Sequence, residues 1–121
     1  MTKETNYDLY EIAMRLDDTL RESQQGLEKA ITDYQKAADH YADVLTNYRK
    51  SRGELTVELK QKYPATIVGD IVKGETAELK GEVEKARLYV KLFEFWMNAY
   101  ESRINSTKFV GNRIKKATGE I

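Results

Sequence analysis

Apolar side chains recur every seven residues along most of this 121-residue chain. In the first half, two rows interleave at steps of three and four residues, which is the 3.5-residue period of helices packed in a left-handed coiled coil. The first row is Ala13, Leu20, Leu27, Tyr34, Tyr41, Tyr48 and Leu55. The second row is Tyr10, Asp17, Gln24, Ile31, Ala38, Leu45, Arg52 and Leu59, with three polar positions. The pattern predicts a helix over about 4–62, running through Gly26 and Gly53.

The second half carries the same repeat and predicts a helix over about 75–117. One row is Leu79, Ala86, Phe93, Tyr100, Thr107 and Ile114. The other row is Val83, Val90, Met97, Ile104 and Gly111. Tyr89, Leu92 and Trp96 flank these rows and widen the apolar stripe, which predicts contact with more than one other helix.

A connector over residues 63–74 separates the two predicted helices. Pro64 disfavours helical dihedrals at the residue before it, so the first helix should end near Lys62. The four apolar residues Ile67, Val68, Ile71 and Val72 fit either a hairpin around Gly69-Asp70 or a short helical turn. We favour the helical turn, because an isolated two-stranded ribbon is marginally stable in water.

These elements predict an all-α protein, a single helical domain over 1–121 folded as a long antiparallel helical hairpin resembling a coiled coil. A single Pro argues against an all-β fold, which needs many turns. If the connector is a tight turn and the two helices pair antiparallel from it, the end of the second helix lies beside about Ser23 of the first. The segment before it should therefore be an overhang or a third helix folded back at Gln24-Gln25-Gly26.

The N-terminal segment carries an apolar stripe that needs a covering surface, formed by Leu9, Ile12, Leu16 and Leu20. We therefore expect a homo-oligomer unless this segment folds back. The connector residues Ile67, Val68, Ile71 and Val72 are further candidates for an interface with a partner.

The composition gives little support to catalysis. With no Cys, disulfides, zinc fingers and thiol chemistry are excluded. The one histidine, His40, has no second His or Cys as a partner. Asp39 and Asp43 lie one turn apart, but a hard metal ion needs more oxygen ligands in a rigid frame. We expect a protein that is not an enzyme and has no cofactor, metal or small-molecule substrate.

Charge is balanced overall, with 20 basic and 20 acidic residues, but it is segregated along the chain. Two basic groups are candidates for contact with nucleic-acid phosphates, or else simply solvated surface. The connector group is Arg49, Lys50, Arg52, Lys60, Lys62 and Lys73. The tail group is Lys108, Arg113, Lys115 and Lys116, which the acidic residues of 1–33 could neutralise.

No apolar run approaches the roughly 18–20 residues that span a bilayer, and the first residues lack the apolar core of a signal peptide. We therefore expect a soluble intracellular protein that does not contact a membrane.

Several stretches together resemble small helical-hairpin proteins of bacteriophages and prophages, over residues 27–114. They are Leu27-Glu28-Lys29-Ala30, Tyr34-Gln35-Lys36-Ala37, Tyr48-Arg49-Lys50, Val72-Lys73-Gly74-Glu75 and the run from Ile104 to Ile114. Such proteins are often encoded near replication and recombination genes. The resemblance implies a cytoplasmic protein of the bacterial host cell that assists a recombinase or a single-strand-binding protein. The alternative is an inhibitor of a host protein that binds through the apolar connector or the N-terminal helix.

Overall fold

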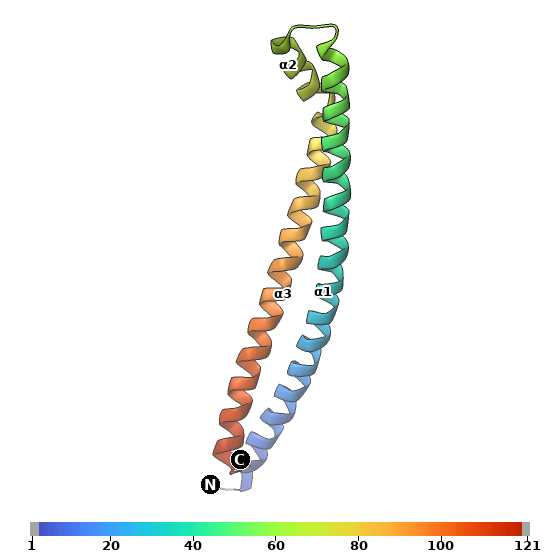
Figure 1. Cartoon of the computed structure of the whole chain (residues 1–121). Coiled ribbons are helices and arrows are strands. Elements are labelled where there is room, and N and C mark those ends of the chain that lie inside the picture. Colours follow the sequence, from blue (N-terminus) through green and yellow to red (C-terminus); the bar gives the residue numbers. More distant parts are fainter. Residues whose placement is uncertain (1–2, 120–121) are drawn as a thin grey trace. The chain divides into compact units, whose positions relative to one another are not determined.

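The computed structural model describes residues 3–119, which form three helices and no strand (Figure 1). The helices are α1 (Lys3–Lys60), α2 (Ala65–Glu75) and α3 (Ala77–Thr118). The predicted all-α class is confirmed. The chain divides into two compact units: unit 1 joins the chain up to Thr32 with the chain from Glu94 onward, and unit 2 is Asp33–Phe93.

The N-terminal segment is neither a separate helix nor an overhang. α1 runs unbroken through Gln24-Gln25-Gly26, and unit 1 groups α1 from Lys3 to Thr32 with the C-terminal part of α3. The prediction went wrong because the connector is not a tight turn. Pairing from such a turn would place Ala86 near Glu54, whereas Ala86 lines a groove in unit 2 together with His40.

We call a position shielded when its residue is buried or half-buried. The shielded positions on α1 and α3 repeat every seven residues, largely as predicted. Both predicted rows of α3 are buried or half-buried throughout, and so is the first predicted row of α1. The second predicted row of α1 is confirmed only in part, since Ala38, Leu45 and Leu59 are half-buried. Another shielded row lies one position before it, formed by Leu9, Leu16, Ser23, Ala30, Ala37, Val44 and Ser51. The predicted members Tyr10, Asp17, Gln24, Ile31 and Arg52 are exposed instead, so no charged side chain lies in this row.

Buried hydroxyl groups in these rows are satisfied within their own helices. Ser23 has no exposed surface, and its hydroxyl donates to the carbonyl oxygen of Thr19 at 2.7 Å. Thr107 on α3 donates to the carbonyl of Arg103 at 2.7 Å. A hydroxyl bonded to the preceding turn loses little on burial, so a small polar residue can take an apolar position.

The predicted helical connector is confirmed, and α2 is longer than the single turn expected. Pro64 has extended dihedrals (φ −61°, ψ 150°), and its carbonyl accepts from the backbone N–H groups of Ile67 and Val68 at 3.1 Å. α2 ends at Thr76, whose hydroxyl and backbone N–H both donate to the carbonyl of Val72. The carbonyl of Thr76 then accepts from the N–H of Lys80, so this one buried residue joins α2 to α3.

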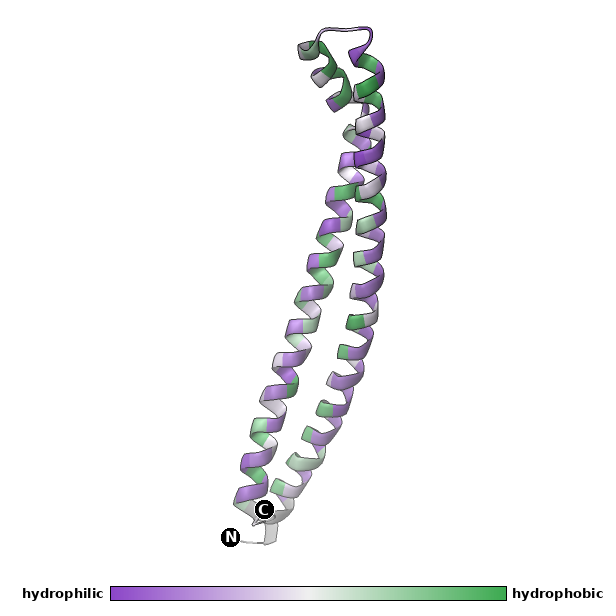
Figure 2. Ribbon diagram, viewed as in Figure 1, coloured by the Kyte–Doolittle hydropathy of each residue, from purple (hydrophilic) through white to green (hydrophobic). Residues whose placement is uncertain are grey.

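α2 is the most consistently hydrophobic of the three helices (Figure 2). Val68 and Val72 are buried one turn apart, with exposed fractions of 2% and 4%, and Ile71 is half-buried. Ile67 is 47% exposed. The buried face of α2 therefore belongs to the core of unit 2, since two valines at this spacing point the same way.

Val68→Ala should lower the free energy of unfolding by about 2 kcal/mol, because it removes buried methyl groups and leaves a cavity. Ile67→Ala removes more carbon atoms from the same helix but should cost less than about 1 kcal/mol, because half of that side chain is already in water. Urea unfolding followed by circular dichroism measures both. Equal losses would mean that α2 does not pack through Val68.

Gly26 and Gly53 both lie inside α1, but only Gly26 faces a neighbouring ring. In unit 1, a Cβ atom added at Gly26 would overlap the Tyr100 ring and lie 2.6 Å from its Cζ, whereas one added at Gly53 meets nothing within 4 Å. Gly53→Ala should therefore stabilise the protein by about 0.5–1 kcal/mol through helix propensity alone.

Gly26→Ala should lack this gain, because the Tyr100 ring must move, and should be at least about 1 kcal/mol less stable than Gly53→Ala. Thermal unfolding of the two variants side by side makes the comparison. A Gly26→Ala protein as stable as the Gly53→Ala protein would contradict the packing of Tyr100 on Gly26.

Candidate binding surfaces

The residues considered for catalysis lie within about one turn of each other on the surface of α1. His40, Asp39 and Asp43 are all exposed. Within the described chain, no group of three or more His, Asp or Glu side chains is placed to hold a metal ion. His40 borders a groove between α1 and α3.

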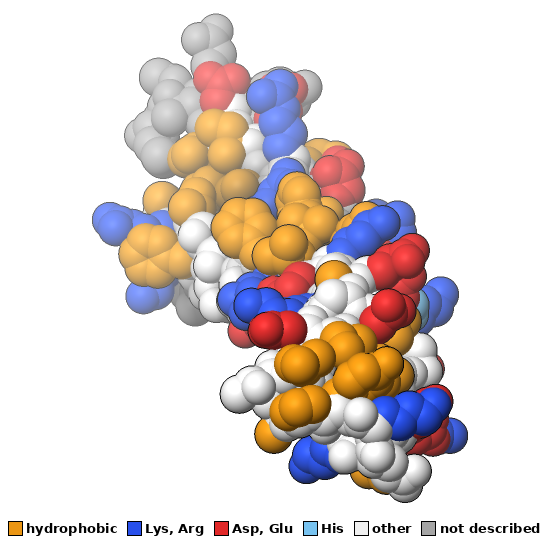
Figure 3. All heavy atoms as spheres, turned by 90° about the horizontal axis from the view of Figure 1, so that it is seen from above, with side chains coloured by type: hydrophobic (Ala, Val, Ile, Leu, Met, Phe, Trp, Pro, Cys, Tyr) orange, Lys and Arg blue, Asp and Glu red, His pale blue; other side chains and the backbone are white. Residues whose placement is uncertain are grey.

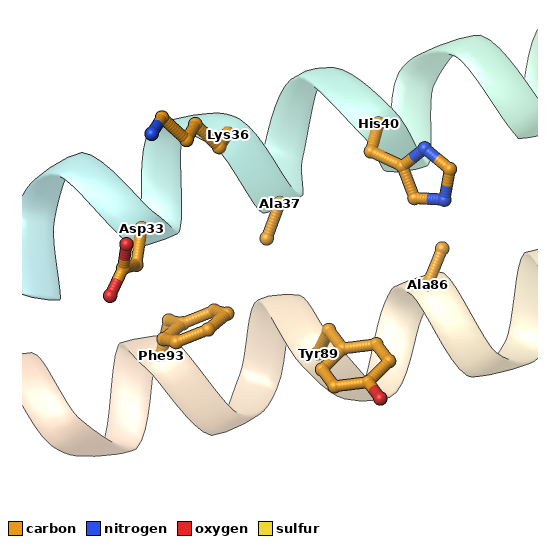
Figure 4. Close-up of a pocket in the computed structure, with 7 residues that line it drawn as sticks. All are labelled: Asp33, Lys36, Ala37, His40, Ala86, Tyr89 and Phe93. Atoms are coloured by element: carbon orange, nitrogen blue, oxygen red, sulfur yellow. The ribbon is translucent and has the colours of Figure 1, made fainter.

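This groove lies in unit 2 between α1 and α3 and has a volume of about 350 Å³ (Figure 4). Its lining residues are Asp33, Lys36, Ala37, His40, Ala86, Tyr89 and Phe93. The two alanines are too small to fill the space between the helices, and the rings of Tyr89 and Phe93 stand beside them. The result is a shallow apolar floor with charged groups at its edge.

A second hollow of about 390 Å³ shares His40, Ala86 and Tyr89 with the first. Val44, Glu82 and Lys85 complete its lining. Since both hollows are open and bordered by charges of both signs, they suit a bulky side chain of a partner better than a small charged ligand.

The connector group of basic residues lies in unit 2, and all six members are exposed. On α1, Arg52 follows Arg49 by three residues, and Lys60 follows Arg49 by eleven. At 100° per residue, this spacing places the three side chains within an arc of about 80° around the helix. The acidic residues Glu54 and Glu58 project more than about 100° away from that arc. We call Arg49, Arg52 and Lys60 the basic face of α1. Lys50 lies off it, while Lys62 and Lys73 lie beyond the helix.

The tail group of basic residues lies in unit 1. Lys108, Arg113, Lys115 and Lys116 are exposed, and the Arg113 guanidinium stands over the Phe109 ring at 5.7 Å from its centroid. That contact occupies one face of the cation. The two basic groups therefore belong to different units, and each places some of its members on one helix face: Arg49, Arg52 and Lys60 on α1, and Lys108 and Lys115 on α3.

The residues predicted to form an oligomer interface are shielded to very different degrees. Leu9, Leu16 and Leu20 are half-buried, whereas Ile12 is exposed. In the connector, Val68 and Val72 are buried in unit 2, Ile71 is half-buried, and Ile67 alone of these four is exposed. The apolar surface left at these positions is therefore small.

Further exposed apolar side chains lie on α3 beside the shielded rows. In unit 2 they are Leu88, Tyr89 and Leu92, and in unit 1 they are Phe95 and Trp96. The flanking residues Tyr89, Leu92 and Trp96 were recognised from the sequence, whereas Leu88 and Phe95 were not placed with them. Their spacing of seven residues was the available signal. Seen from above, hydrophobic side chains gather on the surface between charged ones of both signs (Figure 3).

Comparison with protein-family models, curated proteins and solved structures found no match to this chain. None of the helices in residues 3–119 combines the length and the apolar character needed to cross a membrane.

Proposed function

We propose that this chain is a non-enzymatic helical accessory protein that self-associates and binds single-stranded nucleic acid through the basic face of α1. The observation that carries the binding role is the alignment of three exposed cations, Arg49, Arg52 and Lys60, within about 80° on α1, with the nearby acidic residues on another side. Aligned cations neutralise successive phosphates and release their counterions, which gives affinity without sequence preference.

The dimensions of the basic face suit a nucleic-acid backbone. Arg49 and Lys60 are about 16 Å apart along the helix axis at 1.5 Å per residue. Gly53 and Thr56 lie between them, and neither has a large side chain that would hold a strand away. A strand of a few nucleotides is therefore long enough to meet all three cations.

We further propose that α1 and α3 pair as an antiparallel hairpin with coiled-coil-like packing. In unit 2, Asp33 lies near Phe93 while His40 lies near Ala86 (Figure 4). Residue numbers thus rise along one helix as they fall along the other. The seven-residue spacing of the shielded positions supports the coiled-coil packing.

The resemblance to bacteriophage helical proteins adds the setting to this proposal. The protein would act in the cytoplasm of the bacterial host cell, beside a recombinase or a single-strand-binding protein.

The Arg49→Ala/Arg52→Ala/Lys60→Ala variant should bind a fluorescein-labelled oligo(dT) more weakly and with less dependence on salt. Each lost phosphate contact removes about 0.7 from the slope of log K against log salt for single strands, so the slope should fall by about 2. Fluorescence anisotropy over a salt series gives both quantities. Circular dichroism checks that the helix content is unchanged.

The matched control is Lys50→Ala/Lys62→Ala/Lys73→Ala, which removes the same charge from the same unit but leaves the basic face intact. It should change the slope by less than half as much. Equal losses in the two variants would mean that general charge, and not the basic face, drives binding. If neither variant changes the slope, Lys108→Ala/Arg113→Ala/Lys116→Ala tests the tail group.

A protein partner is the second candidate, favoured by exposed apolar side chains at and beside the connector. Val57, Tyr63 and Ile67 are each about half-exposed or more. An apolar patch of this kind fits an inhibitor directed at a host protein. No anisotropy change at low salt for the wild-type chain would exclude the nucleic-acid role and leave this one.

A further inference from the structure

The part of α3 that belongs to unit 1 has an exposed side that carries two phenylalanines. Phe95 and Phe109 are 64% and 63% exposed. Phe109 follows Phe95 by 14 residues, so at 100° per residue their side chains project within about 40° of each other around the helix. Ile104, which is buried in this unit, projects about 180° from Phe95. The two rings therefore lie on the side of α3 opposite its buried row.

The rest of this side of α3 is small or cationic. Ser102, Ser106 and Arg113 are exposed and project within about 20° of Phe95. We call Phe95, Ser102, Ser106, Phe109 and Arg113 the aromatic face of α3. A partner helix would need an apolar side chain at almost every turn. The aromatic face instead has two rings about 21 Å apart along the axis, with serines between them, so the rings form two separate platforms.

The charge beside these platforms is positive. Between Glu94 and Arg113, the acidic residues are Glu94 and Glu101, which project about 100° and 120° from Phe95. Arg103 projects about 80° from Phe95 to the opposite side, and it is exposed like Arg113. The aromatic face therefore complements an anion that carries flat apolar groups, which is the chemistry of a single strand of nucleic acid.

Both rings are supported by neighbouring side chains. The Arg113 guanidinium stands over the Phe109 ring at 5.7 Å from its centroid. The Phe95 and Trp96 rings meet edge to face, with 6.1 Å between their centroids. A guanidinium backed by a ring presents its other plane to a base, and its N–H groups suit a phosphate. Side chains that are already ordered lose little conformational freedom on binding.

The spacing of the two platforms suits a short strand. Successive stacked nucleotides are about 3.4 Å apart, so about six of them span the roughly 21 Å from Phe95 to Phe109. The side chains of Ser102 and Ser106 are too short to hold a strand away from the helix. Serine hydroxyl groups also donate to phosphate oxygens, so they favour a backbone that passes over them.

We infer that the aromatic face of α3 is a second contact for single-stranded nucleic acid, with one base stacked on Phe95 and another on the Phe109–Arg113 pair. This contact rests on the proposed nucleic-acid role and adds stacking to the charge neutralisation by the basic face of α1. The two contributions respond differently to salt. Stacking releases no counterions, whereas each phosphate contact does.

Phe109→Ala should weaken the binding of oligo(dT) at least about fivefold, as expected for the loss of one stacked base, and should change the salt slope by less than about 0.3. Trp96 is the single tryptophan and lies beside Phe95, so quenching of its emission reports occupancy of the aromatic face. Titration of that emission with unlabelled oligo(dT) measures the dissociation constant. Alanine is a better helix former than phenylalanine, so the helix content should not fall.

Tyr10→Ala is the matched control, because it removes a ring that is 60% exposed on α1 in the same unit. It should leave the dissociation constant unchanged. Arg113→Lys keeps the positive charge but loses the planar group, so it should weaken binding and leave the salt slope as it is. Equal weakening by Tyr10→Ala, or full affinity in either α3 variant, would overturn the inference.

The outcomes separate this contact from the rest of the proposed function. A wild-type chain that does not bind oligo(dT) at low salt would overturn both the nucleic-acid role and this contact. Binding seen by anisotropy with no change in Trp96 emission would overturn this contact alone and leave the basic face as the binding site. If Phe109→Ala lowers the subunit number in sedimentation and binds oligo(dT) as the wild type does, the aromatic face binds a second copy and the inference is wrong.

Discussion

Small side chains on one row of α1 determine how closely another helix can approach it. Ser23 and Ala30 are buried in unit 1, and Ala37 lies at the floor of the groove in unit 2. Close approach lets backbone and ring surfaces meet, as Gly26 and Tyr100 do. Both long helices alternate small and large shielded residues, so that Tyr34 and Tyr41 on α1 flank Ala37, and Phe93 on α3 follows Ala86 by seven residues. The shallow groove forms where the small residues Ala37 and Ala86 both line the space between α1 and α3.

The seven-residue repeat was sufficient to predict the helical class and both shielded rows of α3. It missed the row of α1 that contains Ser23 and Ser51, because periodicity was judged from apolar residues and these two serines look like surface positions. Their hydroxyl groups can be satisfied by the preceding turn, which sequence spacing does not reveal. The helix register was also wrong, because α2 was counted as a tight turn and pairing was measured from it.

The candidate surfaces were only partly predictable. The sequence identifies the basic residues. Which of them share one face of α1 depends on where that helix ends. α1 stops at Lys60 and not at Lys62, so Lys60 is the last cation on that face. The flank of α3 was recognised at Tyr89, Leu92 and Trp96. Leu88 and Phe95 were missed, because a heptad analysis considers the predicted rows and the positions next to them, and these two residues lie farther around the helix.

The place of α2 in the chain has a kinetic consequence. Closing a loop costs conformational entropy that grows with the number of residues it encloses. His40 and Ala86, which meet in unit 2, enclose a shorter loop than Gly26 and Tyr100, which meet in unit 1. Unit 2 should therefore form first, with α2 at the centre of the folding nucleus. Substitutions around α2 would then slow refolding, while those around Tyr100 would mainly accelerate unfolding.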